Sequence, residues 1–434
     1  MIARVQLWGR TIGAISLPEG RDVAAFQYDP DFAQSGIELS PQVMPLSDRV
    51  YEFPSLPHNT FHGLPGLLAD SLPDKFGNAL IDAWLATQGR TAESFSSVER
   101  LCYTGSRGMG ALEYAPSLGP RPRTATKIQI DALVELAGEV LRHRGDLRAH
   151  FHAPEQEKSL RDILRVGTSA GGARAKAVIA WNRQTEEVRS GQVTAPADFE
   201  YWLLKFDGVA DNKDKELEDP KGYCAIEFAY HLMARAAGIT MSECRLLEEH
   251  GRRHFMTRRF DRLPGGEKLH MQSLGALAHL DFNQAGAHAY EQALLVIRQL
   301  GLPMAAVEEQ FRRMVFNIVA RNQDDHAKNI AFLMNKEGQW ALSPAFDVTY
   351  SYNPNGAWTG THQMTLNGKR DGFTLSDFVA GEKAGLMKRG RAIAILDEVL
   401  GAVRRWPEFA AQARLPESVS SKIAGAHRLA FARE

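Results

Sequence analysis

The feature that most constrains the fold is a polar nine-residue segment, residues 321–329, which lies between a helix-forming pattern and a strand-forming pattern. Before it, apolar residues recur at i, i+3, i+4, i+7 and i+8 from Phe311 to Val319, which predicts one buried face of an amphipathic helix. After it, residues 330–334 and 340–342 are apolar runs separated by a turn, which predicts a β-hairpin. We therefore expect an exposed loop on a rigid scaffold, where binding and catalytic side chains are common.

The polar segment reads Arg-Asn-Gln-Asp-Asp-His-Ala-Lys-Asn, and it places Asp324 and Asn329 in a D-x-x-x-x-N spacing. Protein-kinase catalytic loops use this spacing, in which the carboxylate accepts a hydroxyl proton and the amide oxygen binds magnesium. A later carboxylate, Asp347, is a candidate second metal ligand, because Mg²⁺ prefers oxygen ligands. The spacing is also typical of an ordinary polar turn, so both interpretations stay open at this point.

A loop of small residues precedes a strand-like run in the middle of the chain. Small residues with exposed backbone amides approach phosphates closely, and a following lysine adds a positive charge. A plain Gly-Gly turn between strands is the alternative. The candidate phosphate-binding residues here are Ser169, Ala170, Gly171, Gly172, Ala173 and Lys176. A second glycine cluster, residues 105–112, lacks the Lys-Ser/Thr ending of a phosphate loop and is interpreted as a structural turn.

Two further strand-like runs carry candidate nucleotide-binding residues. Lys205 follows the apolar run that begins at residue 199, and a kinase lysine in such a strand holds the α and β phosphates. The alternative is a lysine that snorkels from a strand edge. Residues 254–262 lie where a two-lobed kinase has its interlobe hinge, which makes Arg258 and Phe260 candidates for contacts to the base.

Together these segments follow the chain order of a two-lobed kinase. A small-residue loop is followed by a strand lysine, a hinge, the D-x-x-x-x-N loop and a final metal-type aspartate. Independent turns are not expected to fall into this order and approximate spacing, so the joint pattern favours phosphotransfer. Glu227 lies in a predicted helix over residues 223–237 but outside its apolar stripe, and its partner is left open.

Length and composition indicate an ordinary folded protein of two or three domains. The chain has 434 residues, of which 44% are hydrophobic and 24% charged, and its formal net charge is -1. This charge gives no global basic surface for nucleic acid, so DNA would be met by a local patch or through a partner. The three widely separated cysteines predict neither a disulfide framework nor a zinc site and fit a reducing cytoplasm. No secretory signal and no membrane span are expected.

Several segments carry a wider resemblance. They are residues 169–176, 259–262, 324–329 and 344–347, with residues 26–29, 72–74 and 108–112 in the amino-terminal half. On these segments nearly the whole chain resembles the HipA-type serine/threonine kinase toxins of bacterial type II toxin–antitoxin systems. The D-x-H-x-K-N block and the serine-bearing loop are the most specific of them.

The resemblance implies roles for the candidate residues. Asp324, rather than Asp325, matches the catalytic aspartate, Asn329 and Asp347 match the magnesium ligands, and Lys205 matches the lysine that binds the ATP phosphates. Such kinases use ATP and Mg²⁺ as their cofactors.

Further roles implied by the resemblance concern the nucleotide loop. His326 and Phe346 match positions that line the nucleotide site. Ser169 matches the serine that these kinases autophosphorylate, which ejects the loop and inactivates the enzyme. The chain departs from the usual family residues at Ala170, Arg174, Arg258 and Phe346.

The resemblance also implies partners. The protein target would be an aminoacyl-tRNA synthetase, whose phosphorylation stalls translation and induces dormancy, in the cytoplasm. A small helix-turn-helix antitoxin dimer would bind the kinase and contact DNA for both, so that the two repress together. Three alternatives remain open: a co-repressor subunit with a vestigial kinase site, a small-molecule or lipid phosphotransferase, and a metal hydrolase built on Asp324, Asp325 and His326.

The expected fold is α+β, with a bilobal protein-kinase-like domain and an amino-terminal strand-rich subdomain packed on it. We expect the amino-terminal subdomain at residues 1–118, a linker and helix at 119–158, and the kinase domain at 159–434. Within that domain the small lobe is expected at about 159–257 and the large helical lobe at about 261–434.

Overall fold

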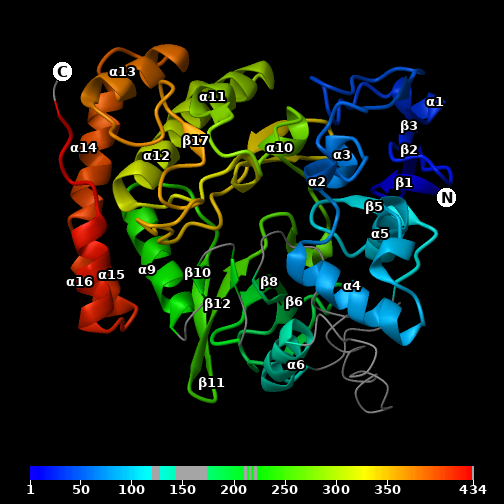
Figure 1. Ribbon diagram of the computed structural model, residues 1–434, viewed down its shortest axis with the longest axis horizontal. Coiled ribbons are helices and arrows are strands. Elements are labelled where there is room, and N and C mark those ends of the chain that lie inside the picture. Colours follow the sequence, from blue (N-terminus) through cyan, green and yellow to red (C-terminus); the bar gives the residue numbers. More distant parts are fainter. Residues whose placement is uncertain (120–127, 143–173, 210–212, 215–216, 219–221, 433–434) are drawn as a thin grey trace.

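The computed structural model describes residues 1–119, 128–142, 174–209, 213–214, 217–218 and 222–432. Figure 1 shows an amino-terminal part in blue and cyan, a sheet-based lobe in green, and a helical lobe coloured mainly from yellow to red. The predicted α+β organisation, with two lobes and a strand-rich amino-terminal part packed on them, is confirmed.

The amino-terminal part is built on a five-stranded antiparallel sheet with the strand order β4-β3-β2-β1-β5. Its first strand alternates exposed and buried residues, and Ala3, Val5 and Leu7 enter the core. The strands are β1 (Ile2–Leu7), β2 (Arg10–Ser16), β3 (Ala25–Tyr28), β4 (Val50–Tyr51) and β5 (Leu112–Ala115). The helices of this part are α1 (Pro30–Ala33), α2 (His58–Phe61), α3 (Gly66–Ala69), α4 (Lys75–Thr87) and α5 (Ser97–Thr104).

The small lobe is a second antiparallel sheet, with the strand order β11-β12-β8-β6-β7. Helix α4 and helix α6 (Ile130–Arg142) share one hydrophobic core with this sheet, in which Leu80, Ala137 and Trp202 are fully buried. The amino-terminal half therefore supplies helices to the small lobe. Its elements are β6 (Lys176–Trp181), β7 (Val188–Ser190), β8 (Glu200–Lys205), β9 (Lys213–Asp214), β10 (Leu217–Glu218), α9 (Tyr223–Ala236), β11 (Cys244–Glu249) and β12 (Arg252–Arg258).

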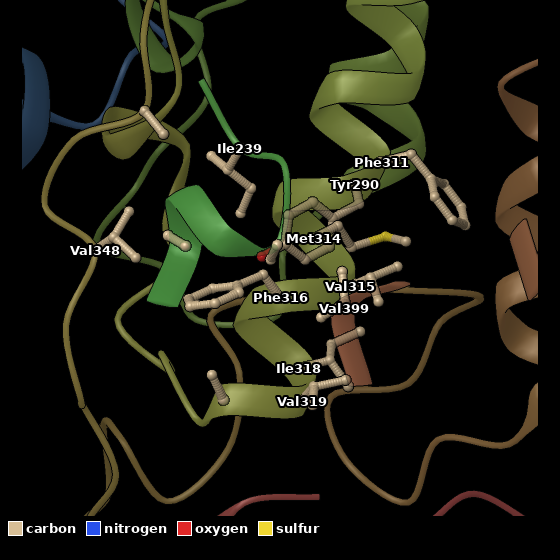
Figure 2. Packing of buried hydrophobic residues seen from close by; sticks show 14 of the residues in the cluster. Ile239, Tyr290, Phe311, Met314, Val315, Phe316, Ile318, Val319, Val348 and Val399 are labelled. Atoms are coloured by element: carbon tan, nitrogen blue, oxygen red, sulfur yellow. The ribbon is translucent and has the colours of Figure 1, made fainter. Parts of the chain in front are cut away.

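The large lobe packs around helix α12 (Met304–Ala320). The apolar stripe predicted from Phe311 to Val319 is confirmed, since these side chains are buried in one cluster with Tyr290 and Val399 (Figure 2). The other helices of this lobe are α10 (Leu274–Leu277), α11 (Tyr290–Gln299), α13 (Leu375–Ala384), α14 (Arg391–Val403), α15 (Trp406–Gln412) and α16 (Glu417–Ala426). Strands β14 (His288–Ala289) and β17 (Met364–Thr365) pair in parallel.

The predicted hairpin after the polar loop is confirmed as β15 (Ala331–Met334) and β16 (Trp340–Leu342). Strand β13 (His270–Ser273) pairs with β15 to complete a three-stranded sheet. Met334 and Trp340 of this sheet pack into the amino-terminal core, and the Trp340 indole N–H donates to the Glu38 carbonyl at 3.2 Å. The sheet thus joins the amino-terminal part to the large lobe.

Two simple expectations can be compared with these elements. Cys102, Cys224 and Cys244 are buried in the described part of the chain, and none forms a disulfide. Within the described ranges, no helix combines the length and apolar character needed to cross a bilayer.

The three-stranded sheet leads to a prediction about acid stability. His270 is fully buried, and burial lowers its pKa from 6.5 to about 4. The unfolded chain therefore binds a proton at this position below pH 6.5, whereas the folded chain stays neutral until about pH 4. We expect up to about 3 kcal/mol of the free energy of unfolding to be lost as the pH falls across this interval.

Urea titrations between pH 4 and 7 measure this loss. His270→Phe should flatten the pH dependence, whereas the same change at exposed His250 serves as the control. Equal pH slopes for wild type and His270→Phe would contradict the prediction. Other buried or partly buried histidines whose pKa falls to about 4 add to the wild-type slope, and they are His231, His254, His279 and His427.

Candidate functional site

A cleft of about 390 Å³ lies where the small lobe, the large lobe and the amino-terminal part meet. The sequence-predicted residues that line it are Lys205, Arg258, Phe260, Asp324, His326, Asn329, Phe346 and Asp347. Segments up to 142 residues apart in the sequence therefore converge on one site. The predicted loop residues Ser169, Ala170, Gly171, Gly172 and Ala173 lie outside the described residues.

The small-lobe sheet forms one wall of the cleft by strand alternation. On β8, Leu203 and Lys205 face the cleft, whereas Trp202 enters the hydrophobic core behind the sheet. On β12, Phe255 and Thr257 lie opposite them in the ladder and also line the cleft. Because side chains on a strand alternate between faces, a lysine two residues after a cleft-facing leucine must also face the cleft.

Lys205 is held between two carboxylates. Its ammonium donates to Glu227 Oε1 at 2.7 Å and to Asp347 Oδ1 at 2.5 Å. Burial alone would lower the pKa of Lys205, but the Asp347 and Glu227 charges raise it above its ordinary value. The lysine is therefore a permanent cation that ties strand β8 to helix α9 and to the segment after β16.

The two carboxylates differ in environment. The Glu227 side chain is 3% exposed, and burial raises its pKa, with Lys205 opposing that rise. Asp347 is 33% exposed and has a left-handed backbone with φ of 56°. Lys205, Lys176 and Arg174 hold its pKa well below the usual range against the effect of burial. Asp347 thus presents a charged carboxylate in a positive field at the cleft surface.

The catalytic-type loop starts where α12 ends. Arg321 takes a left-handed conformation, φ 59°, and this ends the helix. The Trp358 indole N–H donates to Asp324 Oδ1 at 2.6 Å, and the Asn329 amide donates to the Asp324 carbonyl at 2.9 Å. These two contacts close the loop and fix the Asp324 carboxylate at the cleft.

Asp325, the neighbouring carboxylate, is a support group. It accepts hydrogen bonds from the Tyr290 hydroxyl at 2.5 Å, the Gln363 backbone at 2.8 Å and His362 Nδ1 at 2.7 Å. Burial would raise its pKa, but these donors, His362 first, hold it below the usual value. Because Asp325 is enclosed, Asp324 is the carboxylate of this pair that can meet a substrate.

The hydrolase alternative needs Asp324, Asp325 and His326 to converge. His326 Nε2 lies 3.9 Å from Asp324 Oδ1, while Asp325 makes its contacts on the far side of the loop, with Tyr290 and His362. Throughout the ranges that the structure describes, no three His, Cys, Asp or Glu side chains gather as a ligand cluster. The three residues therefore do not form a shared ligand set.

Asn329 and Asp347 are suited to hold a hard cation. The Asn329 amide N–H₂ is engaged by the Asp324 carbonyl, which leaves its oxygen as the ligand atom. Asp347 offers carboxylate oxygens at the same cleft. Two oxygen ligands, completed by phosphates and water, match the preference of Mg²⁺.

The predicted hinge carries aromatic and charged side chains. The Phe260 and Phe346 rings lie 5.7 Å apart and give the cleft an apolar end. Arg258 is exposed, and its guanidinium Nη1 lies 3.7 Å from Glu200 Oε1. The His326 and Phe282 ring centroids lie 5.5 Å apart, and both side chains line the cleft. Each of these predicted residues therefore lines the cleft.

The last residues of the predicted hinge segment, residues 259–262, contact the second glycine cluster. Asp261 is fully buried and accepts from the Gly110 backbone at 2.7 Å, while Arg259 and Arg262 donate both to Asp261 and to the Gly108 carbonyl. A Cβ at Gly110 would lie 2.9 Å from the Met271 backbone nitrogen. Residues 108–110 are therefore a structural turn, as predicted, and they join the amino-terminal part to the hinge.

An ionic contact between the amino-terminal part and the small lobe involves Lys176, the lysine that follows the small-residue loop. Lys176, directly opposite Lys205 in the ladder, donates to Asp74 Oδ2 at 3.0 Å, and both side chains are buried. Asp74 also caps α4 by accepting from Gly77 N at 2.6 Å. Arg174 lies over the Tyr223 ring at 3.6 Å. The predicted phosphate-loop lysine is thus held beside the cleft.

Sequence patterns missed several residues of the site. Glu227, Asp74 and Trp358 each contact a predicted residue, and one side of the cleft consists of amino-terminal residues between 59 and 109. Glu227 carried one signal, because it is an acid in a helix that follows the strand lysine. Asp74 lies in the resemblance segment 72–74, which gave it no role in the site, and Trp358 carried no signal; their partners lie 102 and 34 residues away.

The buried lysine gives a prediction about stability. Lys205→Met leaves the buried Glu227 without its cation, so we expect a loss of about 3 kcal/mol in the free energy of unfolding. Lys205→Met combined with Glu227→Gln should recover part of it. Lys336→Met, which breaks the exposed Lys336–Glu267 pair, is the matched control and should change little. Urea denaturation measures all four proteins, and equal losses at positions 205 and 336 would contradict the prediction.

Comparison with known proteins agrees with this architecture. A solved complex of HipA, HipB and operator DNA from a toxin–antitoxin system of Shewanella oneidensis MR-1 matches with a TM-score of 0.66 at 18% identity, covering 98% of this chain and 94% of that chain. A Sinorhizobium fredii protein named "Putative kinase Y4dM" is 28% identical over 184 residues, 37% of this chain, and the chain spans 40% of that relative's length.

Family models match both halves of the chain. The HipA N-terminal domain matches residues 3–115, and the HipA-like C-terminal domain matches residues 168–406. Together they contain every predicted site residue. The chain belongs to the HipA family.

Proposed function

We propose that this chain is an ATP- and Mg²⁺-dependent serine/threonine protein kinase that acts as the toxin of a type II toxin–antitoxin module. The observation that carries the proposal is the convergence of Lys205, Asp324, Asn329 and Asp347 on one cleft, with Lys205 paired to Glu227. In protein kinases the same pairing of a strand lysine with a helix glutamate accompanies the active arrangement.

The proposed donor site uses positive groups in the cleft and beside it. Lys205 and Lys176 would bind the ATP phosphates, and Phe260, Phe346 and Arg258 would line the base end with the hinge backbone. Asn329 and Asp347 would hold Mg²⁺, which neutralises charge on the phosphates when bound. His326 would contact the nucleotide from the large-lobe side.

The proposed reaction is transfer of the γ-phosphoryl group to a hydroxyl. The acceptor oxygen forms a bond to γ-phosphorus as the bond from that phosphorus to the β-γ bridging oxygen breaks, releasing ADP, and the hydroxyl proton passes to Asp324. Trp358 holds one Asp324 oxygen at 2.6 Å and so orients the other for the acceptor. Catalysis of this kind depends on positioning and charge neutralisation, so loss of Asp324 should lower turnover by orders of magnitude without unfolding the chain.

The proposed protein target is a translation component such as an aminoacyl-tRNA synthetase, and Ser169 is the proposed site of self-phosphorylation. A helix-turn-helix antitoxin dimer is the proposed partner, through which the chain would meet operator DNA, in the cytoplasm. The likeness to a solved HipA–HipB–DNA complex supports the partner class. Residues 1–118, 119–158 and 159–434 remain the proposed domains.

Intact mass after incubation with Mg²⁺-ATP tests the activity and the serine together. Wild type should gain one phosphate, whereas Asp324→Asn and Ser169→Ala should gain none. Asp325→Asn is a poor control because that residue supports the loop, so Asp198→Asn, at an exposed residue that does not line the cleft, serves instead. Undiminished phosphate gain in Asp324→Asn would refute the catalytic assignment.

Two further measurements separate the alternatives. If wild type gains no phosphate, calorimetry with Mg²⁺-ATP distinguishes a kinase that needs its target, which binds, from a vestigial co-repressor, which does not. Phosphoamino-acid analysis after incubation with cell extract separates a protein kinase from a small-molecule phosphotransferase.

A further inference from the structure

The C-terminal end of helix α12 is capped by residues 426–428, a segment at the C-terminal end of the last helix of the large lobe. The last carbonyls of a helix lack partners within the helix and need outside donors. Here the Arg428 backbone N–H donates to the Val319 carbonyl at 2.9 Å, and the Arg428 guanidinium donates to the Ile318 carbonyl at 2.9 Å. The Tyr230 hydroxyl donates a hydrogen bond to the Ala320 carbonyl at 2.6 Å. Residues far away in the sequence therefore satisfy the last carbonyls of the helix that leads into the catalytic-type loop.

The same segment also contacts the first residue of the loop. Arg321 Nε donates to the Ala426 carbonyl at 2.8 Å. Asp371 accepts from Arg428 and lies 4.0 Å from Arg321, so one carboxylate serves two arginines. A positive charge at a helix C-terminus is also favourable for the helix dipole. Residues 426–428 thus fix both the helix end and the start of the loop.

A polar chain then runs from Arg428 to the interior of the loop. The Arg428 guanidinium lies 2.8 Å from His362 Nε2, and His362 Nδ1 lies 2.7 Å from Asp325 Oδ2. Arginine can only donate, so His362 Nε2 must accept and the ring proton must be on Nδ1, where it is donated to Asp325. The side chains of His362 and Asp325 are at most 1% exposed. Each group thereby sets the orientation of the next.

We propose that residues 426–428, acting through His362 and Asp325, are a positioning element that holds Asp324 in its reactive place. Asp324 directly follows Gln323 and precedes Asp325, and Arg321 donates to the Gln323 side chain at 3.0 Å. The residues on both sides of Asp324 are therefore held by contacts to Arg321 and His362, while the Asp324 carboxylate faces the cleft. None of these supporting groups lines the cleft, so their effect is transmitted through the loop.

This inference rests on the proposed phosphotransfer, and its consequence is a loss of turnover without a loss of nucleotide binding. His362→Leu removes both hydrogen-bonding atoms, whereas His362→Gln keeps one donor for Asp325 and one acceptor for Arg428. We expect His362→Leu and Arg428→Ala to lower kcat about 10- to 100-fold, because small displacements of a catalytic group are costly. His362→Gln should retain most of the turnover.

The experiment compares these variants with wild type and with Arg404→Ala, an exposed arginine near the same segment. Three quantities are measured: kcat with Mg²⁺-ATP, the Kd for Mg²⁺-ATP by calorimetry, and amide hydrogen exchange of residues 321–329. Lower kcat with an unchanged Kd and faster exchange in this segment supports the proposal. Arg404→Ala should leave all three values unchanged.

The outcomes separate this inference from the proposed function. If wild type transfers no phosphate, the proposed function fails, but exchange in residues 321–329 still reports whether Arg428 and His362 hold the loop. Unchanged exchange in His362→Leu and Arg428→Ala overturns the inference whatever the activity. Equal loss of turnover in His362→Gln and His362→Leu also overturns it, because the hydrogen-bonded chain would then have no role. If His362→Leu fails to fold, Arg428→Ala decides.

Discussion

The contact on which the rest of the site depends is Lys205 held between Glu227 and Asp347. Removing charges from water is costly, and this cost is offset only when opposite charges lie in good geometry. The small-lobe strand, helix α9 and the segment after β16 must therefore keep fixed positions relative to one another. The separation of the two lobes, and with it the shape of the cleft, follows from this requirement.

The amino-terminal part is packed against both lobes. It shares a hydrophobic core with the small-lobe sheet through α4, and another with the β15–β16 hairpin through Met334 and Trp340. Its polar contacts with the rest of the chain include the Asp74–Lys176 pair and the hydrogen bond from Gly110 to Asp261. Residues of this part also line the cleft itself. A substrate entering the site would therefore meet all three parts.

The loop that carries Asp324 shows how two adjacent carboxylates acquire different tasks. Asp325 is enclosed by Tyr290, His362 and Gln363 and serves as an anchor. Asp324 keeps its carboxylate at the cleft, where it accepts a hydrogen bond from the Trp358 indole N–H. The two neighbouring carboxylates therefore face different environments, Asp325 the protein interior and Asp324 the cleft. From the sequence, the D-x-x-x-x-N spacing and the family resemblance both singled out Asp324, but neither assigned a role to Asp325.

Much of the fold followed from local patterns. The stripe from Phe311 to Val319, the hairpin after the polar loop and the strand that ends at Lys205 were all predicted correctly. These features depend on periodicities of 3.6 and 2 residues, which are properties of neighbouring positions. The kinase-like order of Lys205, Asp324, Asn329 and Asp347 is likewise a property of the chain itself, and all four side chains line one cleft.

The tertiary structure alone decided which buried polar groups meet. Glu227 lies outside the apolar stripe predicted for its helix, yet it is 3% exposed and bound to Lys205. Asp74 and Lys176 are 102 residues apart, and Arg428 and His362 are 66 apart. No local pattern encodes such pairs, because the energy that favours them arises only when both groups leave water together. The sequence therefore determined the elements and the reactive side chains, and tertiary packing determined the charges and hydrogen bonds that hold them in place.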